Sequence, residues 1–268
     1  MSASGPTLSS EYASATPLQI RIDTHARHSE HPDDPASMVL DLLELTGAEE
    51  LADIGCGDAR FLAQLANGGH RGRLVGVDTS PAMVAAAAAI AGVDTRLADA
   101  EHLPFADGEF DLTTARHMLY HVPHPEAALR EFQRITRPGG RVIVTVNHPG
   151  TCARTRELVT RHARPFGLAP VEEMANSVTS STLPDMMDAV FGNAHVHRFD
   201  NALIFSSAPP LLRFAEALFS FCGVDTDTPH RAEIRAAVAA DIDTWFAANP
   251  GQVWRDPKGY ISVVATVE

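Results

Sequence analysis

The segment Leu51–Arg60, LADIGCGDAR, joins a short apolar stretch to a glycine-containing turn and the start of an amphipathic segment. Its first four residues are typical of a buried strand, and apolar side chains recur at helical spacing from Phe61 onward. Gly55 and Gly57 let the backbone turn sharply and approach a ligand closely. This order of strand, glycine turn and helix predicts a nucleotide pocket, in which backbone N–H groups and a helix N-terminus lie beside the ligand.

The alternation of strand and helix patterns continues beyond this segment. Further strand patterns occur at 74–77, 97–98, 110–115 and 142–146. Helical patterns lie between them at 81–91 and 127–135. The tripeptide Pro138-Gly139-Gly140 is typical of a turn before the fifth strand. Five strands separated by helices predict an α/β fold with a parallel, doubly wound sheet.

The flanking segments have a looser pattern. Residues 1–17 are expected to form a mobile tail, and the apolar face of 38–45 predicts a helix. Further expected elements are helices at 151–162, 184–190, 210–221 and 231–246 and strands within 195–205 and 260–267. We therefore expect an N-terminal tail and helical lid (1–46), a nucleotide-binding core (47–148), and a mostly helical cap with the last strands (149–268).

Composition narrows the classes of partner. The chain has 268 residues and a hydrophobic content of 45%, which is ordinary for a globular protein. Its formal net charge of −13 argues against a surface that binds the phosphate backbone of a nucleic acid. Three scattered cysteines predict free thiols in a reducing compartment. No apolar run is long enough to span a bilayer, and the first residues lack a signal-peptide pattern. A cytoplasmic location without nucleic-acid or membrane partners is expected.

Three aspartates lie at the expected ends of three strands: Asp53, Asp78 and Asp99. The carboxyl ends of parallel strands meet at one edge of the sheet, where ligands bind. A dinucleotide is disfavoured because its glycine fingerprint needs a third glycine where this chain has Arg60. The three acids suit an ammonium group, a ribose diol and an exocyclic amine, and S-adenosylmethionine carries all three.

Residues 51–146 resemble the class I S-adenosylmethionine-dependent methyltransferases of the small-molecule type. The matching segments are LADIGCGDAR, VGVDTSPAM, LADAEHLPFADGEFD, RHMLYHVPHPEAALREFQRITRPGG and RVIVTV. The resemblance implies a Rossmann-like sheet of seven strands, the last two in the His195 region and at Tyr260–Val267, and S-adenosyl-L-methionine as cofactor. One departure is Ala59, where relatives often have glycine.

By this resemblance, the cofactor-binding residues belong to the glycine turn and to the ends of four strands. Those for the methionine end are Asp53, Gly55, Cys56 and Gly57, together with the backbone carbonyl of Arg116; those for the nucleoside are Asp78, Thr79, Met83, Asp99 and Ala100. Arg27, with Arg21, is a candidate clamp for a carboxylate of the cofactor or of an acidic substrate, and a solvated arginine is the alternative.

Candidate acceptor-side residues follow the fourth and fifth strands: the catalytic candidates His117, Tyr120 and His121, and beyond them Asn147 and His148. Methyl transfer needs a general base only if the acceptor arrives protonated. His121 is the best placed of these residues as a base or as a donor to the acceptor. A histidine that packs over the cofactor is the alternative for it, and a core position is the alternative for Tyr120.

Several other functions remain open at this point. No metal is expected, because neither His121 with His124 nor His195 with His197 has a convincing third ligand. The apolar segment 201–257 could roof an acceptor pocket, form a homodimer surface or simply pack helices together. We expect methylation of a small organic acceptor at O, N or C, with a role in specialised metabolism. The alternatives are an RNA or protein methyltransferase, a non-catalytic S-adenosylmethionine-binding regulator and, more distantly, a nicotinamide dehydrogenase.

Overall fold

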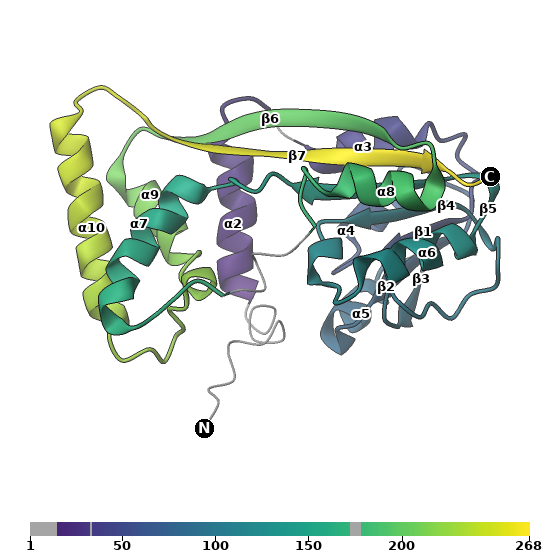
Figure 1. Ribbon diagram of the computed structural model, residues 1–268, viewed down its shortest axis with the longest axis horizontal. Coiled ribbons are helices and arrows are strands. Elements are labelled where there is room, and N and C mark those ends of the chain that lie inside the picture. The colour runs from purple at the N-terminus through teal and green to yellow at the C-terminus, as the bar shows by residue number, and fades with distance from the viewer. Residues whose placement is uncertain (1–14, 33, 172–177) are drawn as a thin grey trace. The chain divides into compact units, whose positions relative to one another are not determined.

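The computed structural model describes residues 15–32, 34–171 and 178–268, which separate into two compact units. The sheet unit contains residues 34–149, the described part of 176–199, and 260–268. The helical unit contains the described parts of 1–33 and 150–175, and residues 200–259. Figure 1 labels the elements of both units. The division of the chain at residues 46 and 148 stays a prediction.

A seven-stranded sheet with the order β3-β2-β1-β4-β5-β7-β6 confirms the expected doubly wound architecture. The strands are β1 (Leu51–Ile54), β2 (Leu74–Asp78), β3 (Val93–Leu97), β4 (Phe110–Arg116), β5 (Thr136–Asn147), β6 (His195–Phe205) and β7 (Trp254–Thr266). β1 to β5 pair in parallel, and β7 runs antiparallel to β5. The chain leaves β1 toward β2 on one side and returns as β4 on the other, which creates the switch point at which such sheets bind ligands.

Helices cover both faces of the sheet unit. α3 (Pro35–Leu43), α4 (Arg60–Asn67) and α5 (Pro81–Ala87) pack with one apolar cluster, and α6 (Pro125–Ile135) and α8 (Leu183–Phe191) pack with the other. The alternating side chains of the central strands supply both clusters, so these strands are buried on both sides, as parallel strands usually are. Within the described ranges, no helix is long and apolar enough to cross a membrane.

The helical unit has its own apolar core. Its helices are α2 (Ala15–His28), α7 (Ala153–Ala163), α9 (Ala208–Glu216) and α10 (Arg231–Ala248). The buried residues of this core include Leu158, Val159, Leu203, Phe205, Leu211, Phe214, Ile234, Val238, Ile242 and Trp254. Short 3-10 turns occur in this unit at Arg164–Phe166 (η2) and Ser220–Cys222 (η4), and in the sheet unit at Leu119–His121 (η1).

Several boundaries differ from expectation. α5 ends at Ala87 and α9 at Glu216, each about one turn earlier than its apolar pattern predicts. Pro138-Gly139-Gly140 lies inside β5 as a register shift, because Gly139 N donates to Val267 O and Val267 N donates to Gly140 O. α2 includes residues 15–17, and the rest of the expected tail lies outside the described residues.

Candidate functional site

The glycine turn after β1 is fixed to the neighbouring strand β2. Gly55 N and Cys56 N both donate to Val77 O, at 2.8 and 2.9 Å. Gly55 has a positive φ of 69°, and a Cβ there would lie 2.6 Å from Cβ of Met118, so only glycine fits without a shift of that side chain. The turn is therefore held in one conformation by its neighbours.

Two residues after Gly55, Gly57 borders open space, which we call the glycine cradle. A Cβ at this residue would meet nothing within 4 Å, and its φ is +57°. α4 begins at Arg60; its N-cap residue Ala59 makes no side-chain cap, and Arg60 N donates a long hydrogen bond of 3.4 Å to Asp58 Oδ1. Free N–H groups at a helix start favour a negatively charged ligand group. A carboxylate suits this position.

Asp78 lies half-buried at the end of β2, as predicted. Its Oδ2 accepts a hydrogen bond from Gly57 N and its Oδ1 accepts one from Ser80 N, both at 2.9 Å. Each carboxylate oxygen has a second acceptor position, so the side chain can also accept from two neighbouring hydroxyl groups. Thr79 is exposed beside it, and Met83 is half-buried in the first turn of α5.

The loop after β3 carries Asp99 and Ala100. Asp99 is exposed and accepts a hydrogen bond from Glu101 N at 2.9 Å, whereas Ala100 is buried. Glu101 accepts hydrogen bonds from N and Nδ1 of His124, at 3.0 and 3.1 Å, and thereby fixes the loop to the start of α6. Since Asp99 is exposed, its carboxylate remains accessible to a base amine.

The side chain of Asp53 makes a buried ion pair that we did not predict. Its Oδ2 lies 2.7 Å from Nη2 of Arg116, and its Oδ1 accepts from Thr114 Oγ1 at 2.8 Å. Arg116 also lies over the ring of Phe61, 4.0 Å from its centroid. Direct binding of an ammonium group by Asp53 stays a prediction. The signal for the pair was present in the alternation of β4, which puts Thr114 and Arg116 on one face.

Cys56 points its side chain into the sheet unit. A Cβ on Gly76 of β2 would lie 2.8 Å from Cys56 Sγ, so the thiol fills the space left by that glycine. Burial raises the pKa of the Cys56 thiol, and the carboxylates of Asp53 and Asp78 raise it further. The thiol is a packing group, and a ligand contact at this residue would come from its backbone.

The three predicted catalytic residues follow β4. His117 has a φ of 54°, and its N–H donates to Thr145 O at 2.8 Å. Tyr120 and His121 lie in η1, with ring centroids 4.5 Å apart. Within the described ranges, the buried Nδ1 of His121 has no hydrogen-bond partner, and burial lowers the pKa of this imidazole. Their catalytic roles stay predictions.

A further histidine at this edge has a defined hydrogen-bond partner. His148 follows β5, and its Nδ1 lies 2.7 Å from Oγ of Ser180. Ser180 is only 5% exposed, and its N–H donates to Asn147 O at 3.3 Å. The sequence analysis named Asn147 and His148 but missed Ser180, because no local pattern links residues 32 positions apart.

Arg27 and Arg21 belong to α2 in the helical unit, whereas the residues above belong to the sheet unit. Arg27 is exposed. Arg21 Nη1 donates to Ala217 O at 3.0 Å, and its guanidinium lies over Phe221. Arg21 therefore has a structural partner within its own unit, and the carboxylate clamp stays a prediction.

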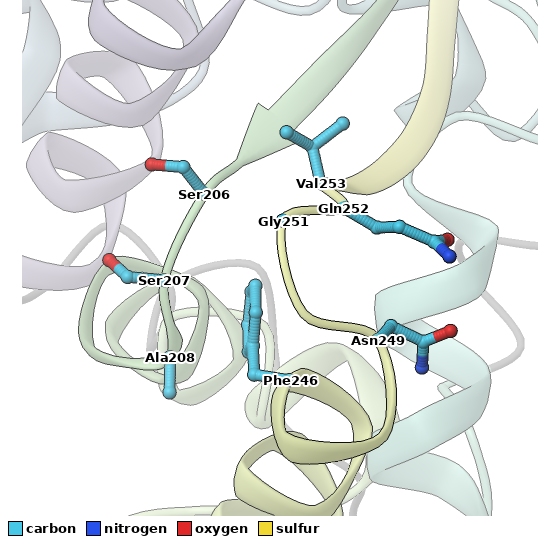
Figure 2. A pocket seen from close by; sticks show the side chains of 8 residues that line it. All are labelled: Ser206, Ser207, Ala208, Phe246, Asn249, Gly251, Gln252 and Val253. Carbon is cyan, nitrogen blue, oxygen red and sulfur yellow. The ribbon is translucent and has the colours of Figure 1, made fainter.

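Figure 2 shows a pocket of about 420 Å³ within the helical unit. It is lined by Ser206, Ser207, Ala208, Phe246, Asn249, Gly251, Gln252 and Val253. None of these is a predicted cofactor-binding or catalytic residue, and all lie in segment 201–257, whose role as a roof of the acceptor pocket stays a prediction. Among the described residues, no group of three histidine, cysteine or acidic side chains could hold a metal ion.

Comparison with known proteins places these features in context. A family profile described as "Methyltransferase domain" matches residues 52–144. The chain is 43% identical over 171 residues to the uncharacterized protein YafE of Escherichia coli K12, an alignment that covers 63% of this chain and 79% of that protein. It is 41% identical over 102 residues to a demethylmenaquinone methyltransferase of Mycolicibacterium vanbaalenii, covering 38% and 43% of the two chains.

A solved structure from Anabaena variabilis, provisionally described as a methyltransferase from an antibiotic biosynthesis pathway, has a similar fold. Its TM-score is 0.64 at 20% identity, covering 86% of this chain and 96% of that chain. The chain spans less than half the length of the demethylmenaquinone methyltransferases that it matches.

Proposed function

Since the chain belongs to the class I S-adenosylmethionine-dependent methyltransferases, we propose that it transfers a methyl group from S-adenosylmethionine to a small organic acceptor. The observation that carries this proposal is the link between Asp78 and Gly57. Gly57 N donates a hydrogen bond of 2.9 Å to Asp78 Oδ2, which holds this carboxylate beside the open space at Gly57. Asp78 would bind the ribose there.

The residues at this edge fit the parts of S-adenosylmethionine. Asp78 offers acceptor positions for the two ribose hydroxyls, and exposed Asp99 offers one for the adenine amine. The start of α4 suits the carboxylate of the methionine end. For the ammonium group, the backbone carbonyl of Arg116 is the better candidate, because the Asp53 carboxylate already accepts from Thr114 and Arg116.

When bound, S-adenosylmethionine supplies a methyl group on a positively charged sulfur. Because that charge disappears during transfer, little new charge has to be stabilised by the protein. The residues of the sheet edge would act mainly by holding cofactor and acceptor in line, which can contribute several kcal/mol. Turnover on an acceptor that arrives deprotonated therefore requires no catalytic base.

Two observations support the proposal that the acceptor is a small molecule: the negative net charge of the chain and its similarity to a demethylmenaquinone methyltransferase. The net charge of −13 disfavours a surface that binds nucleic acid, and the mycobacterial relative is named for methylation of demethylmenaquinone. A role in specialised metabolism is part of this proposal, and the provisional description of the Anabaena structure supports it.

The test is methyl transfer from S-adenosylmethionine carrying a ¹⁴C-labelled methyl group. The full chain is incubated with separate panels of phenols, amines and carbon acids, and with total RNA and a protein extract as rivals. We expect label in at least one small product, with S-adenosylhomocysteine released in equal amount. Label in RNA or protein alone, or cofactor binding without transfer to any panel, would contradict the proposal.

A further inference from the structure

The part of β6 that belongs to the sheet unit lies at an edge of the sheet. β6 is the last strand in the sheet order, and its four residues from His195 to Arg198 are all exposed (Figure 1). A strand with one covered face shows alternating burial, so both faces of this stretch are open to solvent. The open stretch is short, because further along β6 Leu203 makes a bridge with Ser29. Such an edge can accept a further strand.

The open stretch is held against β7 at both of its ends. Asn193 Nδ2 donates to Thr266 O at 3.0 Å, and Thr266 N donates to Asn193 Oδ1 at 2.8 Å. At the other end, the ring of Phe199 stacks on the ring of Tyr260, with the centroids 5.2 Å apart. The direction in which the side chains between these two contacts project is therefore fixed within the sheet unit.

Two exposed histidines lie next to each other on one face of this stretch. His195 and His197 are two residues apart in a strand, so their side chains share a face and their Cβ atoms are about 7 Å apart. Within the described part of the chain, neither imidazole makes a hydrogen bond or an ion pair. Two accessible imidazoles provide half of a tetrahedral site for a divalent transition-metal ion.

One copy of the chain cannot complete such a site. The sequence pattern predicts no metal at this pair because a third ligand is lacking, and the described residues contain no group of three potential ligands. A second copy of the chain carries the same two histidines on the same kind of edge. Two copies together therefore offer the four ligands that a tetrahedral site needs.

An antiparallel pairing of the two edges brings the four histidines together. In a two-fold pair centred on Val196, His195 of each copy lies opposite His197 of the other. Side chains directly opposite each other have Cβ atoms about 5 Å apart, so the four imidazoles rise from a rectangle of about 5 by 7 Å. On the other face Val196, which is 45% exposed in one chain, meets its counterpart. Arg198 lies opposite Ala194, so no like charges meet.

We propose that His195 and His197 from two copies of this chain bind one divalent transition-metal ion, which joins the copies at the β6 edge. Imidazole nitrogen suits zinc, copper and nickel, and zinc binds four such ligands in a tetrahedron. Burial of Val196 adds an apolar contact to the same interface. The inference does not depend on the proposed methyltransferase function, since neither histidine is a cofactor or acceptor candidate.

The first test measures the mass of the full chain, freed of metal with EDTA and titrated with zinc chloride at neutral pH. Light scattering should show a rise from 28.7 kDa to twice this value, with one zinc ion for two chains. His195→Gln and His197→Gln should each need about tenfold more zinc or higher for the same dimer fraction. His230→Gln, at an exposed histidine of the helical unit, should behave like the wild-type chain.

Three results of this titration would overturn the proposal. They are a wild-type chain that stays monomeric with zinc, a dimer that forms equally well without zinc, and a dimer that His197→Gln forms as readily as the wild-type chain. Because both histidines are exposed, their replacement should leave the fold intact, and circular dichroism checks this for each variant.

The second test determines the register of the two edges. Val196→Cys should form a disulfide between two chains when the zinc-loaded protein is oxidised with diamide, because directly opposite residues have Cα atoms about 4.5–5.5 Å apart. Arg198→Cys is the matched control on the same face, since its two copies would lie about 13 Å or more apart. The native cysteines are buried and do not compete. Equal cross-linking of both variants, or none in Val196→Cys, would overturn the four-histidine site.

Discussion

Asp53 and Arg116 join two neighbouring strands at the base of the glycine turn. Asp53 is completely buried in β1, and its Oδ2 lies 2.7 Å from Nη2 of Arg116 at the end of β4. Thr114 donates a further hydrogen bond to the same carboxylate, and Phe61 packs under the guanidinium. The negative charge below the turn is thereby compensated within the protein.

Replacing Arg116 should strongly destabilise the sheet unit. Arg116→Met leaves the carboxylate of Asp53 buried without its cation, and breaking a buried ion pair in this way costs about 3 kcal/mol or more. The free energy of unfolding, measured by urea denaturation, gives the cost. As a control, Arg60→Met removes an exposed ion pair with Asp58 and should cost less than about 1 kcal/mol.

The double variant Asp53→Asn/Arg116→Met tests the cause. Because it removes both charges, it should recover most of the stability that Arg116→Met loses. Equal stabilities of Arg116→Met and the wild-type chain would show that Asp53 does not depend on this partner.

Gly57 should matter for binding more than for folding. Gly57→Ala places a methyl group in the open cradle and, because φ is positive, costs about 1 kcal/mol of stability. Gly139→Ala is the matched control, since Gly139 also has a positive φ and open space around its Cβ position. We expect similar stability losses, but a weaker affinity for S-adenosylmethionine in Gly57→Ala alone. Equal affinities in a calorimetric titration would show that no ligand occupies the cradle.

Glu49 makes stability depend on pH. Partial burial alone would raise the pKa of Glu49, but hydrogen bonds from the Thr46 hydroxyl and from the N–H groups of Thr46 and Gly47 outweigh it and lower the pKa from 4.5 to about 2. An acid with a lowered pKa contributes stability above its unfolded pKa and loses that contribution as pH falls through the folded value.

Glu49→Gln should therefore lower the free energy of unfolding near pH 7 by about 1–2 kcal/mol, after allowance for solvent screening at this partly exposed site. The difference from the wild-type chain should shrink as the pH falls from 4.5 toward about 2. Denaturation series near pH 7 and pH 3 measure it. Glu157→Gln, at an exposed glutamate of α7, should change stability by less than about 0.5 kcal/mol at either pH. A deficit in Glu49→Gln of the same size at both pH values would contradict the assignment.

The strand ends at the site could be predicted because local signals are strong there. Asp53 and Asp78 each follow an apolar run, and parallel strands bring such ends to one edge whatever the details of the loops. The start of α5 has an equally strong local signal, because Ser80 directly precedes a proline in the first turn. In the structure the Ser80 hydroxyl accepts a hydrogen bond from Met83 N.

Side-chain partners between distant segments were not predictable in the same way. Ser180 meets His148 across 32 residues, and nothing near either residue marks the pair. Pro138-Gly139-Gly140 has a turn composition, yet it lies within β5 and is hydrogen-bonded to Val267, the residue after β7, because tertiary hydrogen bonds outweigh local preference. The pairing of Asp53 with Arg116 is an intermediate case. Alternation along β4 places Thr114 and Arg116 on the same face, so a partner for Asp53 on that face could have been predicted.

The most direct measurement of the central claim is the calorimetric affinity of S-adenosylmethionine for the wild-type chain and for Asp78→Ala. Loss of hydrogen bonds to the charged carboxylate should weaken binding by about ten- to a hundredfold, while circular dichroism shows a folded protein. Asp94→Ala, at an exposed aspartate of β3, should bind like the wild-type chain. Unchanged affinity in folded Asp78→Ala would contradict the assignment of this sheet edge as the cofactor site.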